Sequence, residues 1–233
     1  MDLFSVLMAA VAPGISLLAY FYLKDRYETE PIHLVGKLFL FGVLLVIPAM
    51  VIQSAFIEEI GGENQFTFAF FISGGLEEFL KWFVVYHLIY RHSSFDEPYD
   101  GIVYAVAVSL GFATLENILY ALVNGTSISM LIMRALLPVS GHALFGVMMG
   151  YYLGKAKFMR AHERKYLFAS MLLPILWHGS FDYIQLVAQS NWIWFMLPFM
   201  TLLWIRTIWK INRANEHSPL GRIMRSDEEF EVG

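Results

Sequence analysis

Residues 34–56 read LVGKLFLFGVLLVIPAMVIQSAF, a run of 23 residues in which Lys37 is the only charged side chain. A helix that crosses the hydrocarbon core of a bilayer needs about 20 mostly apolar residues, so this stretch predicts a membrane-spanning helix. The rest of the chain has the same character. Of its 233 residues 58% are hydrophobic and only 15% are charged, whereas about a quarter of an ordinary soluble domain is charged. The composition therefore excludes a water-soluble globular protein and predicts an integral membrane protein.

Six further windows of this kind occur along the chain. We expect spans at 3–23, 34–56, 66–90, 102–123, 130–154, 166–188 and 192–209. The predicted fold class is therefore all-α: a polytopic helix bundle with about seven transmembrane helices, or eight, forming one membrane domain over 1–209. The remainder, 210–233, is rich in charged residues and is expected to be a disordered cytoplasmic tail.

The distribution of basic residues predicts the orientation in the membrane. Of the 16 Lys and Arg residues, 12 lie in the segments that follow the first, third, fifth and seventh spans, and none lies in the alternate segments 57–65, 124–129 and 189–191. Cytoplasmic segments carry the excess of Lys and Arg, so the N-terminus is predicted outside and the C-terminus in the cytoplasm. With no soluble domain in the predicted architecture, the activity is expected in or beside the lipid bilayer.

Ionisable side chains inside the predicted spans are the strongest functional signal. A charged residue at the centre of a spanning helix costs about 2.5–3.5 kcal/mol, so such residues mark functional sites by default. They lie on four spans, at the middle or in the outer half of each. The candidate catalytic residues are Glu77, Glu78, Glu116, His142, His178 and Asp182, and the supporting candidates are Lys81, Asn117 and, outside the spans, Glu97.

Spacing divides these residues into groups. Lys81 follows Glu77 by four residues and Glu78 by three, so on a helix it faces both carboxylates and can neutralise one of them. The other Glu is then free to titrate as a general base or acid. His178 and Asp182 are also four residues apart, so Asp182 can fix the tautomer of His178 or bind a metal together with it.

Other residues flank this cluster. Pro138 predicts a break or kink just outside His142. Arg134 and Lys37, each close to an end of its span, are expected to extend to the membrane interfaces. Glu97 belongs to the acidic loop 95–101, which is expected to be a solvated turn; as an alternative, Asp96, Glu97 and Asp100 line an inner mouth. A stripe of small residues, Gly146, Gly150 and Gly154, predicts close packing against a neighbouring helix.

Several classes of chemistry are excluded by absence. The chain has no cysteine, so a thiol nucleophile and Cys-bound metals are ruled out, and the chemistry must use carboxylates, imidazoles, hydroxyls or a metal bound by oxygen and nitrogen. The HExxH, GxSxG and P-loop motifs do not occur. Two alternatives to hydrolysis stay open. A proton-coupled transporter would use the same intramembrane carboxylates, but the lack of inverted repeats disfavours it. A non-enzymatic scaffold or immunity protein would use none of them.

Six blocks of sequence contain the candidate catalytic and supporting residues. They are 12–14 with 20–25, 77–82, 95–101, 111–117, 134–142 and 178–182. These blocks closely resemble the PrsW family of bacterial intramembrane proteases, and the resemblance extends to about residue 205. It implies an endopeptidase of the bacterial cell membrane that makes the first, site-1 cut near the extracytoplasmic end of a single-pass anti-sigma factor. Such a cut leads to release of an extracytoplasmic-function sigma factor. The implied partners are this substrate and the bilayer, with no nucleic acid; no oligomeric state is predicted.

The same pattern is similar to the wider superfamily of CAAX prenyl proteases and bacteriocin-processing proteins, in which a membrane Glu activates water. By this likeness Glu77 or Glu78 would be the base and His178 a polarising or oxyanion group. The chain differs in having Glu116 where the CAAX enzymes carry a His, and Asp182 where they often carry Asn. A metal-dependent mechanism with zinc as the cofactor therefore stays open beside a metal-free one. Its candidate ligands are Glu116, His142, His178 and Asp182.

Overall fold

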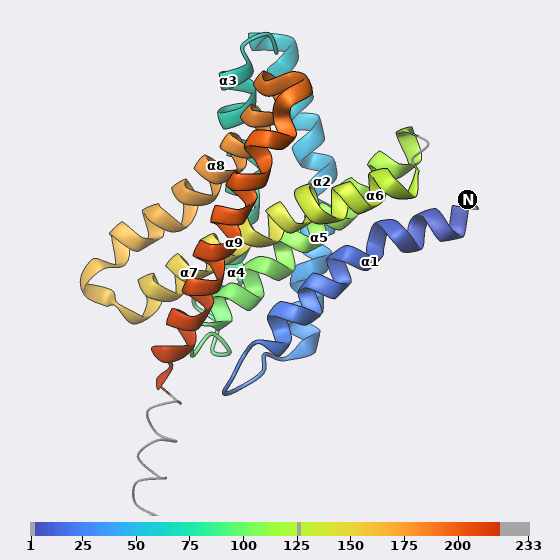
Figure 1. Ribbon diagram of the computed structural model, residues 1–233. Coiled ribbons are helices and arrows are strands. Elements are labelled where there is room, and N and C mark those ends of the chain that lie inside the picture. Colours follow the sequence, from blue (N-terminus) through green and yellow to red (C-terminus); the bar gives the residue numbers. More distant parts are fainter. Residues whose placement is uncertain (1–2, 125–126, 220–233) are drawn as a thin grey trace, which may run out of the picture.

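A computed structural model describes residues 3–124 and 127–219 (Figure 1). Within these ranges the chain is helical and has no β-strand, as predicted. Five stretches are long and apolar enough to cross a membrane: Leu3–Leu23, Ile32–Glu59, Asp100–Asn124, Ile128–Phe158 and Arg160–Glu216. The prediction of an all-helical protein with several membrane-spanning segments is therefore confirmed.

The predicted span 66–90 is not among these five stretches, although it is helical. It consists of α3 (Gln65–Thr67), the π-helical segment η1 (Phe68–Ser73) and α4 (Gly74–Ile89). Glu77, Glu78 and Lys81 lie near the middle of this segment and make it less apolar than the five stretches. The same charges that suggest a function thus weaken its resemblance to an ordinary membrane-spanning helix.

The last apolar stretch contains two helices. They are α8 (Glu163–Ala188) and α9 (Trp192–Glu216), and the short 3₁₀ turn η4 (Gln189–Asn191) joins them. Helix α9 continues beyond the predicted end of the last span, so the expected tail begins inside a helix. Lys210 explains this extension, because it is buried and its amine donates a hydrogen bond to the hydroxyl of Tyr152 at 3.2 Å. The tail from residue 220 lies outside the described residues.

Helix α5 (Asp100–Asn124) runs through the middle of the bundle and contacts α1 (Leu3–Leu23), α2 (Ile32–Ile60) and α7 (Ser140–Phe158) (Figure 1). Most of its side chains are buried. Small residues allow this crowding: a Cβ on Gly111 would collide with the carbonyl oxygen of Phe39 in α2, and one on Gly42 would collide with that of Val108 in α5. Close approach of backbones lets dispersion forces hold helices together where lipid offers no hydrophobic gradient.

The predicted glycine stripe on α7 faces α5. A Cβ on Gly146 would lie 2.8 Å from Ser109 Oγ, and one on Gly150 would collide with the carbonyl oxygen of Gly101. A Cβ on Gly154 would collide in the same way with Pro98. The stripe therefore fixes α5 against α7, as its spacing predicts.

The remaining helices enclose this centre. Helix α8 packs against both α7 and α4, and α9 packs against α7 and α8. Between α6 (Ile128–Arg134) and α7 the π-helical segment η2 (Ala135–Val139) contains Pro138. Proline has no N–H for the regular helical bond, and the local winding changes to the π form to compensate. The helical stretch Ile128–Phe158 is nevertheless continuous, so the chain does not break at Pro138, and the expected kink stays a prediction.

We predict that Gly150→Ala destabilises the protein, whereas Gly36→Ala does not. The added methyl of Gly150→Ala forces α5 and α7 apart, at a cost of about 1–3 kcal/mol for overpacking. A Cβ on Gly36 meets nothing within 4 Å, so the better helix propensity of alanine is the only change there. Unfolding of the two variants in detergent is the measurement. Equal stability of the two variants would contradict the proposed role of the stripe.

Candidate active site

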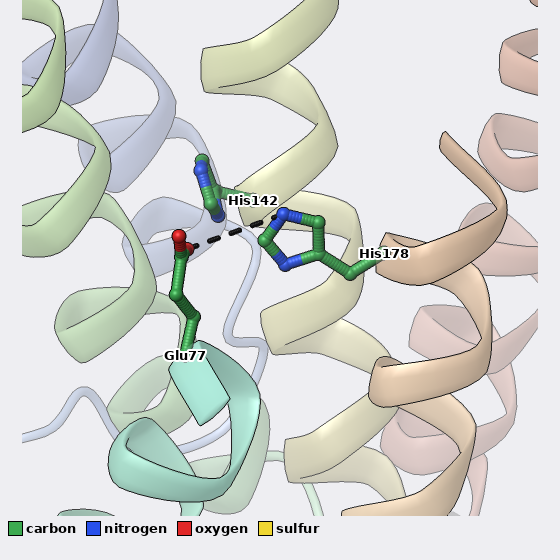
Figure 2. A group of neighbouring side chains, drawn as sticks. All are labelled: Glu77, His142 and His178. Carbon is green, nitrogen blue, oxygen red and sulfur yellow. Dashed lines mark ion pairs between the residues drawn. The ribbon is translucent and has the colours of Figure 1, made fainter. Parts of the chain in front are cut away.

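Three side chains from three helices converge inside the bundle (Figure 2). Glu77 comes from α4, His142 from α7 and His178 from α8. Each offers one ligand atom, and these atoms all lie within 4.8 Å of one another. The three residues are 7%, 4% and 4% exposed. Sequence positions as distant as 77 and 178 therefore form one buried group, as the shared depth of their spans predicts.

A fully buried ion pair lies next to this group. Lys81 and Glu78 are both 0% exposed, and Lys81 Nζ is 2.8 Å from Glu78 Oε1 and 3.4 Å from Glu77 Oε2. Lys81 Nζ also lies 4.1 Å from the centre of the Phe112 ring. The contact predicted from the spacing of these three residues is therefore present. The amine of Lys81 neutralises the carboxylate of Glu78 and also faces that of Glu77.

Each histidine is held by a carboxylate through one ring nitrogen. His178 Nδ1 lies 3.0 Å from Glu78 Oε1, and His142 Nε2 lies 3.0 Å from Glu116 Oε2. On the other side of its ring, His142 Nδ1 is 3.0 Å from Lys81 Nζ. Such contacts orient an imidazole and fix its tautomer. For His178 they leave Nε2 facing Glu77 Oε2 at 4.0 Å, the contact dashed in Figure 2.

Two residues outside the predicted set support the carboxylates. Ser73, the last residue of η1, donates a hydrogen bond to Asp182 Oδ2 at 2.6 Å. Gln53 of α2 donates one to Glu77 Oε1 at 3.1 Å. Asp182 Oδ2 also lies 3.6 Å from His178 Nε2. Both supporting residues are polar positions inside apolar segments, which is the one signal in the sequence that could have identified them.

The expectation that Arg134 extends to the interface is wrong. Arg134 Nε instead donates to Asn117 Oδ1 at 2.7 Å, and its guanidinium lies 4.0 Å from the centre of the Tyr120 ring. Asn117 in turn donates to the carbonyl oxygen of Ala10 at 2.8 Å, which ties α5 to α1. A guanidinium inside the bilayer is stabilised by partners within the bundle, and Asn117 and Tyr120 provide them.

The converging side chains line a small cavity that adjoins a larger hollow. The cavity has a volume of about 120 Å³ and is lined by Ser73, Glu77, Glu116, His142, His178 and Asp182, among others. The hollow, of about 410 Å³, lies against α6, η2, α8 and the start of α9, and its lining includes Tyr120, Met130, Met133, Leu137 and Trp192. Arg134, Pro138 and Gln185 line both. The polar group therefore has a neighbouring, mostly apolar space large enough for part of a polypeptide.

The structure does not bring Glu97 to this cluster. Glu97 is buried in the loop that precedes α5, whereas Glu116 lies sixteen residues into that helix from Asp100. At 1.5 Å per residue this is a separation of about 24 Å along the axis. The other predicted residues, on α4, α5, α7 and α8, do meet, except Asn117, which is connected to the cavity only through Arg134.

A buried Glu with two carboxylate-oriented histidines, brought together by three helices, is a donor set of the kind found in metallohydrolases. The family model of PrsW intramembrane metalloproteases matches residues 30–205. Protease PrsW of Geobacillus kaustophilus is 53% identical, over 93% of this chain and 95% of that protein. The Bacillus subtilis protease is 53% identical over 91% and 96%, and the Clostridioides difficile protease 32% over 94% and 93%. No solved structure matches. The chain belongs to the PrsW family of intramembrane metalloproteases and is a peptidase.

The donor set matches, in chemical type, the metal that this family name implies: a carboxylate with two imidazoles is a common set of protein ligands for catalytic zinc. His178 has a supporting carboxylate on Nδ1 and keeps Nε2 toward Glu77. Both ring nitrogens of His142 are engaged, with Glu116 and with Lys81, so metal binding there requires one of these two contacts to be replaced.

The geometry groups Glu77 with His142 and His178. The set predicted from the sequence instead joined Glu116 and Asp182 to the histidines. These two carboxylates lie beside His142 and His178 respectively, and their role as ligands stays a prediction.

We predict that Lys81→Met strongly destabilises the protein, by about 3–5 kcal/mol, since it leaves the carboxylate of Glu78 buried without its cation. The double variant Glu78→Gln/Lys81→Met removes both charges and should recover part of that loss. Lys37→Met, which removes an exposed lysine of α2, is the matched control and should behave like the parent. The measurement is unfolding in detergent. A double variant that is less stable than Lys81→Met alone would contradict the importance of charge compensation here.

Proposed function

We propose that this peptidase makes the first, site-1 cut in a single-pass anti-sigma factor of a bacterial cell membrane, near the extracytoplasmic end of the substrate helix. Membership of the PrsW family supports the substrate class through the resemblance described above. The observation that carries the proposal is the buried group of Glu77, His142 and His178, which is a hydrolytic donor set inside the bilayer. The expected consequence is release of an extracytoplasmic-function sigma factor.

The proposed topology has seven crossings, with the N-terminus outside. The positive-inside rule supports it, because the basic residues collect in alternate segments. In this topology α4 and α7 run inward and α5 and α8 run outward, so that the cavity falls at the middle or in the outer half of the membrane. A cut near the outer end of a substrate helix fits this depth.

In the proposed mechanism Glu77, His142 and His178 would hold the metal. A bound divalent metal would polarise the scissile carbonyl and make the attacking water more acidic. Asp182, a carboxylate that lines the cavity beside His178, takes the proton of that water and later gives it to the leaving nitrogen. Ser73 holds Asp182 for this transfer by donating to Oδ2. Glu78 keeps His178 oriented from the side of Lys81.

The larger hollow is the proposed position of the substrate segment. A helix hides its carbonyl groups in its own hydrogen bonds, so a substrate has to unwind before its peptide bond can be attacked. The apolar side chains of Met130, Met133 and Leu137 suit an extended segment drawn from the bilayer, and the shared lining by Arg134 and Gln185 leads from there to the cavity.

We expect Glu77→Gln to reduce cleavage of a doubly tagged anti-sigma factor, co-expressed at equal membrane abundance, by at least about 100-fold, the scale of a lost proton-transfer or ligand group. The metal content of the purified protein should fall with it. Glu59→Gln, which changes an exposed carboxylate at the end of α2, should leave cleavage unchanged.

A zinc chelator separates this mechanism from the metal-free one. Cleavage by the parent that stops on chelation and returns with Zn²⁺ supports the metal site. Cleavage that resists chelation and still depends on Glu77 would instead make this residue the base that activates water. Absence of cleavage by the parent, with both proteins present, would favour the transporter or scaffold.

A cysteine at Met133 should crosslink to the substrate, because Met133 lines the hollow. The native chain has no cysteine, so each introduced thiol reports on one position. Met133→Cys is placed in the Glu77→Gln background to retain the substrate, which carries single cysteines near the outer end of its helix. Leu44→Cys, on a lipid-facing part of α2 with 67% exposure, is the control. Crosslinking of Leu44→Cys as strongly as Met133→Cys would show that the hollow is not where the substrate lies.

A further inference from the structure

A second group of carboxylates lies at the other end of α5. Asp25 and Glu30 belong to the connection between α1 and α2, and Asp100 is the first residue of α5. One oxygen from each lies within 4.8 Å of the others. The group is separated from Glu116 of the active site by about 24 Å of helix, so it is not part of the proposed catalytic chemistry.

One of these carboxylates is fully buried with an oxygen that lacks a partner. Asp100 is 0% exposed; its Oδ2 accepts the backbone N–H groups of Asp96 and Glu97 at 2.8 and 2.6 Å, whereas its Oδ1 accepts none. Asp25 is half-buried, and the backbone N–H groups of Arg26 and Tyr27 in its own loop interact with its carboxylate. Glu30, also buried, accepts a hydrogen bond from the hydroxyl of Tyr104. An orphaned buried carboxylate oxygen is costly, so its persistence requires compensation.

No protein cation forms an ion pair with these carboxylates. Within the described part of the chain, no Lys, Arg or His nitrogen lies within 4.0 Å of the three. The amine of Lys157 interacts with Asp100 and Glu30 only at longer range, because it donates to the carbonyl oxygen of His92 at 3.0 Å and lies 4.5 Å from the centre of the Phe95 ring. Glu78 differs from these carboxylates, because the amine of Lys81 lies beside it and neutralises its charge.

The electrostatic cost of this arrangement raises the pKa values of the two carboxyl groups that the connection between α1 and α2 contributes. Burial, and then the negative charges of Glu97 and Glu30, raise the pKa of Asp25 to about 7. Burial is also the main reason that the pKa of Glu30 is raised to about 7. Like charges this close repel one another unless protons or a cation lie between them.

A polar hollow reaches one member of the group, Glu30. This hollow of about 310 Å³ is lined by Glu28, Ser93, Ser94 and Asp96 in addition to Glu30 itself. Its lining is polar and negatively charged, which attracts cations. The donors of the group are all oxygens, and divalent cations that prefer oxygen ligands are Mg²⁺ and Ca²⁺, whereas zinc and copper sites favour nitrogen and sulfur.

We propose that Asp25, Glu30 and Asp100 form a second metal site, which binds a divalent cation of the Mg²⁺ and Ca²⁺ class. The ion ties the connection between α1 and α2 to the first turn of the central helix. Its effect is on the stability of the bundle, independent of the chemistry at Glu77, His142 and His178.

The test uses the full chain purified in detergent, in the Glu77→Gln background, so that a ligand of the proposed catalytic metal is missing. The midpoint of thermal unfolding is measured after treatment with EDTA and then with Mg²⁺, Ca²⁺ or Na⁺ at equal ionic strength. We expect a saturable rise with a divalent ion of about 5–10 °C at a hundredfold excess over its dissociation constant. The ion that acts at the lower concentration is the preferred occupant.

Asp25→Asn is the decisive variant, because it removes one charged ligand at a half-buried loop position while keeping the size of the side chain and an oxygen that can accept a hydrogen bond. This variant should lose the response to divalent ions, while Glu59→Gln keeps it. A response that persists in Asp25→Asn would place the ion elsewhere and overturn the proposal. So would an absent response in the parent together with greater stability of Asp25→Asn, which would show that protons alone compensate the group. Displacement of Tb³⁺ luminescence by Ca²⁺ in the parent gives the same answer without a variant.

Discussion

The interaction on which the active site depends is the ion pair between Lys81 and Glu78. Both side chains are fully buried, and a charge removed from water in the interior of a protein costs several kcal/mol unless it is paired and hydrogen-bonded. The pair meets this condition through additional contacts: Glu78 Oε1 also lies 3.0 Å from His178 Nδ1, and Lys81 Nζ lies 3.0 Å from His142 Nδ1. The same contacts thus neutralise the buried charges and orient both histidines, so a change in any one of these four side chains affects the other three.

The backbone that supports this network is arranged around α5. Glycines at the contacts of α5 with α2 and α7 bring the helices so close that even a methyl group would collide. Two π-helical segments, η1 and η2, lie directly before the parts of the chain that carry Glu77 and His142. Such segments change the direction in which the following side chains point and often occur at functional sites. A rigid centre with locally rewound helices around it gives polar side chains a fixed geometry inside an apolar medium.

Carboxylates cluster near both ends of α5, and their negative charge is balanced differently at each end. At Glu116 the carboxylates have histidines, Lys81 and Arg134 as neighbours. At Asp100 the carboxylates have backbone N–H groups and a tyrosine hydroxyl as hydrogen-bond donors, and among the described residues no cation pairs with them. The first arrangement contains its own positive charge and is suited to chemistry. The second lacks one, and the proposed cation would make it a clasp between the first connection and the central helix.

The sequence by itself determined the helical membrane class, the family, the glycine contacts of α7 and the pairing of Glu77 and Glu78 with Lys81. These depend on composition and on neighbours three or four residues apart, which helical geometry fixes locally. Only the tertiary structure decided which residues complete the site. Gln53, Ser73 and Arg134 reach it from other helices, and Glu97 does not reach it at all. The physical reason is that the choice of which helices contact one another depends on backbone packing and on the π-helical segments. Neither of these produces a periodic pattern in the sequence that would name the partner.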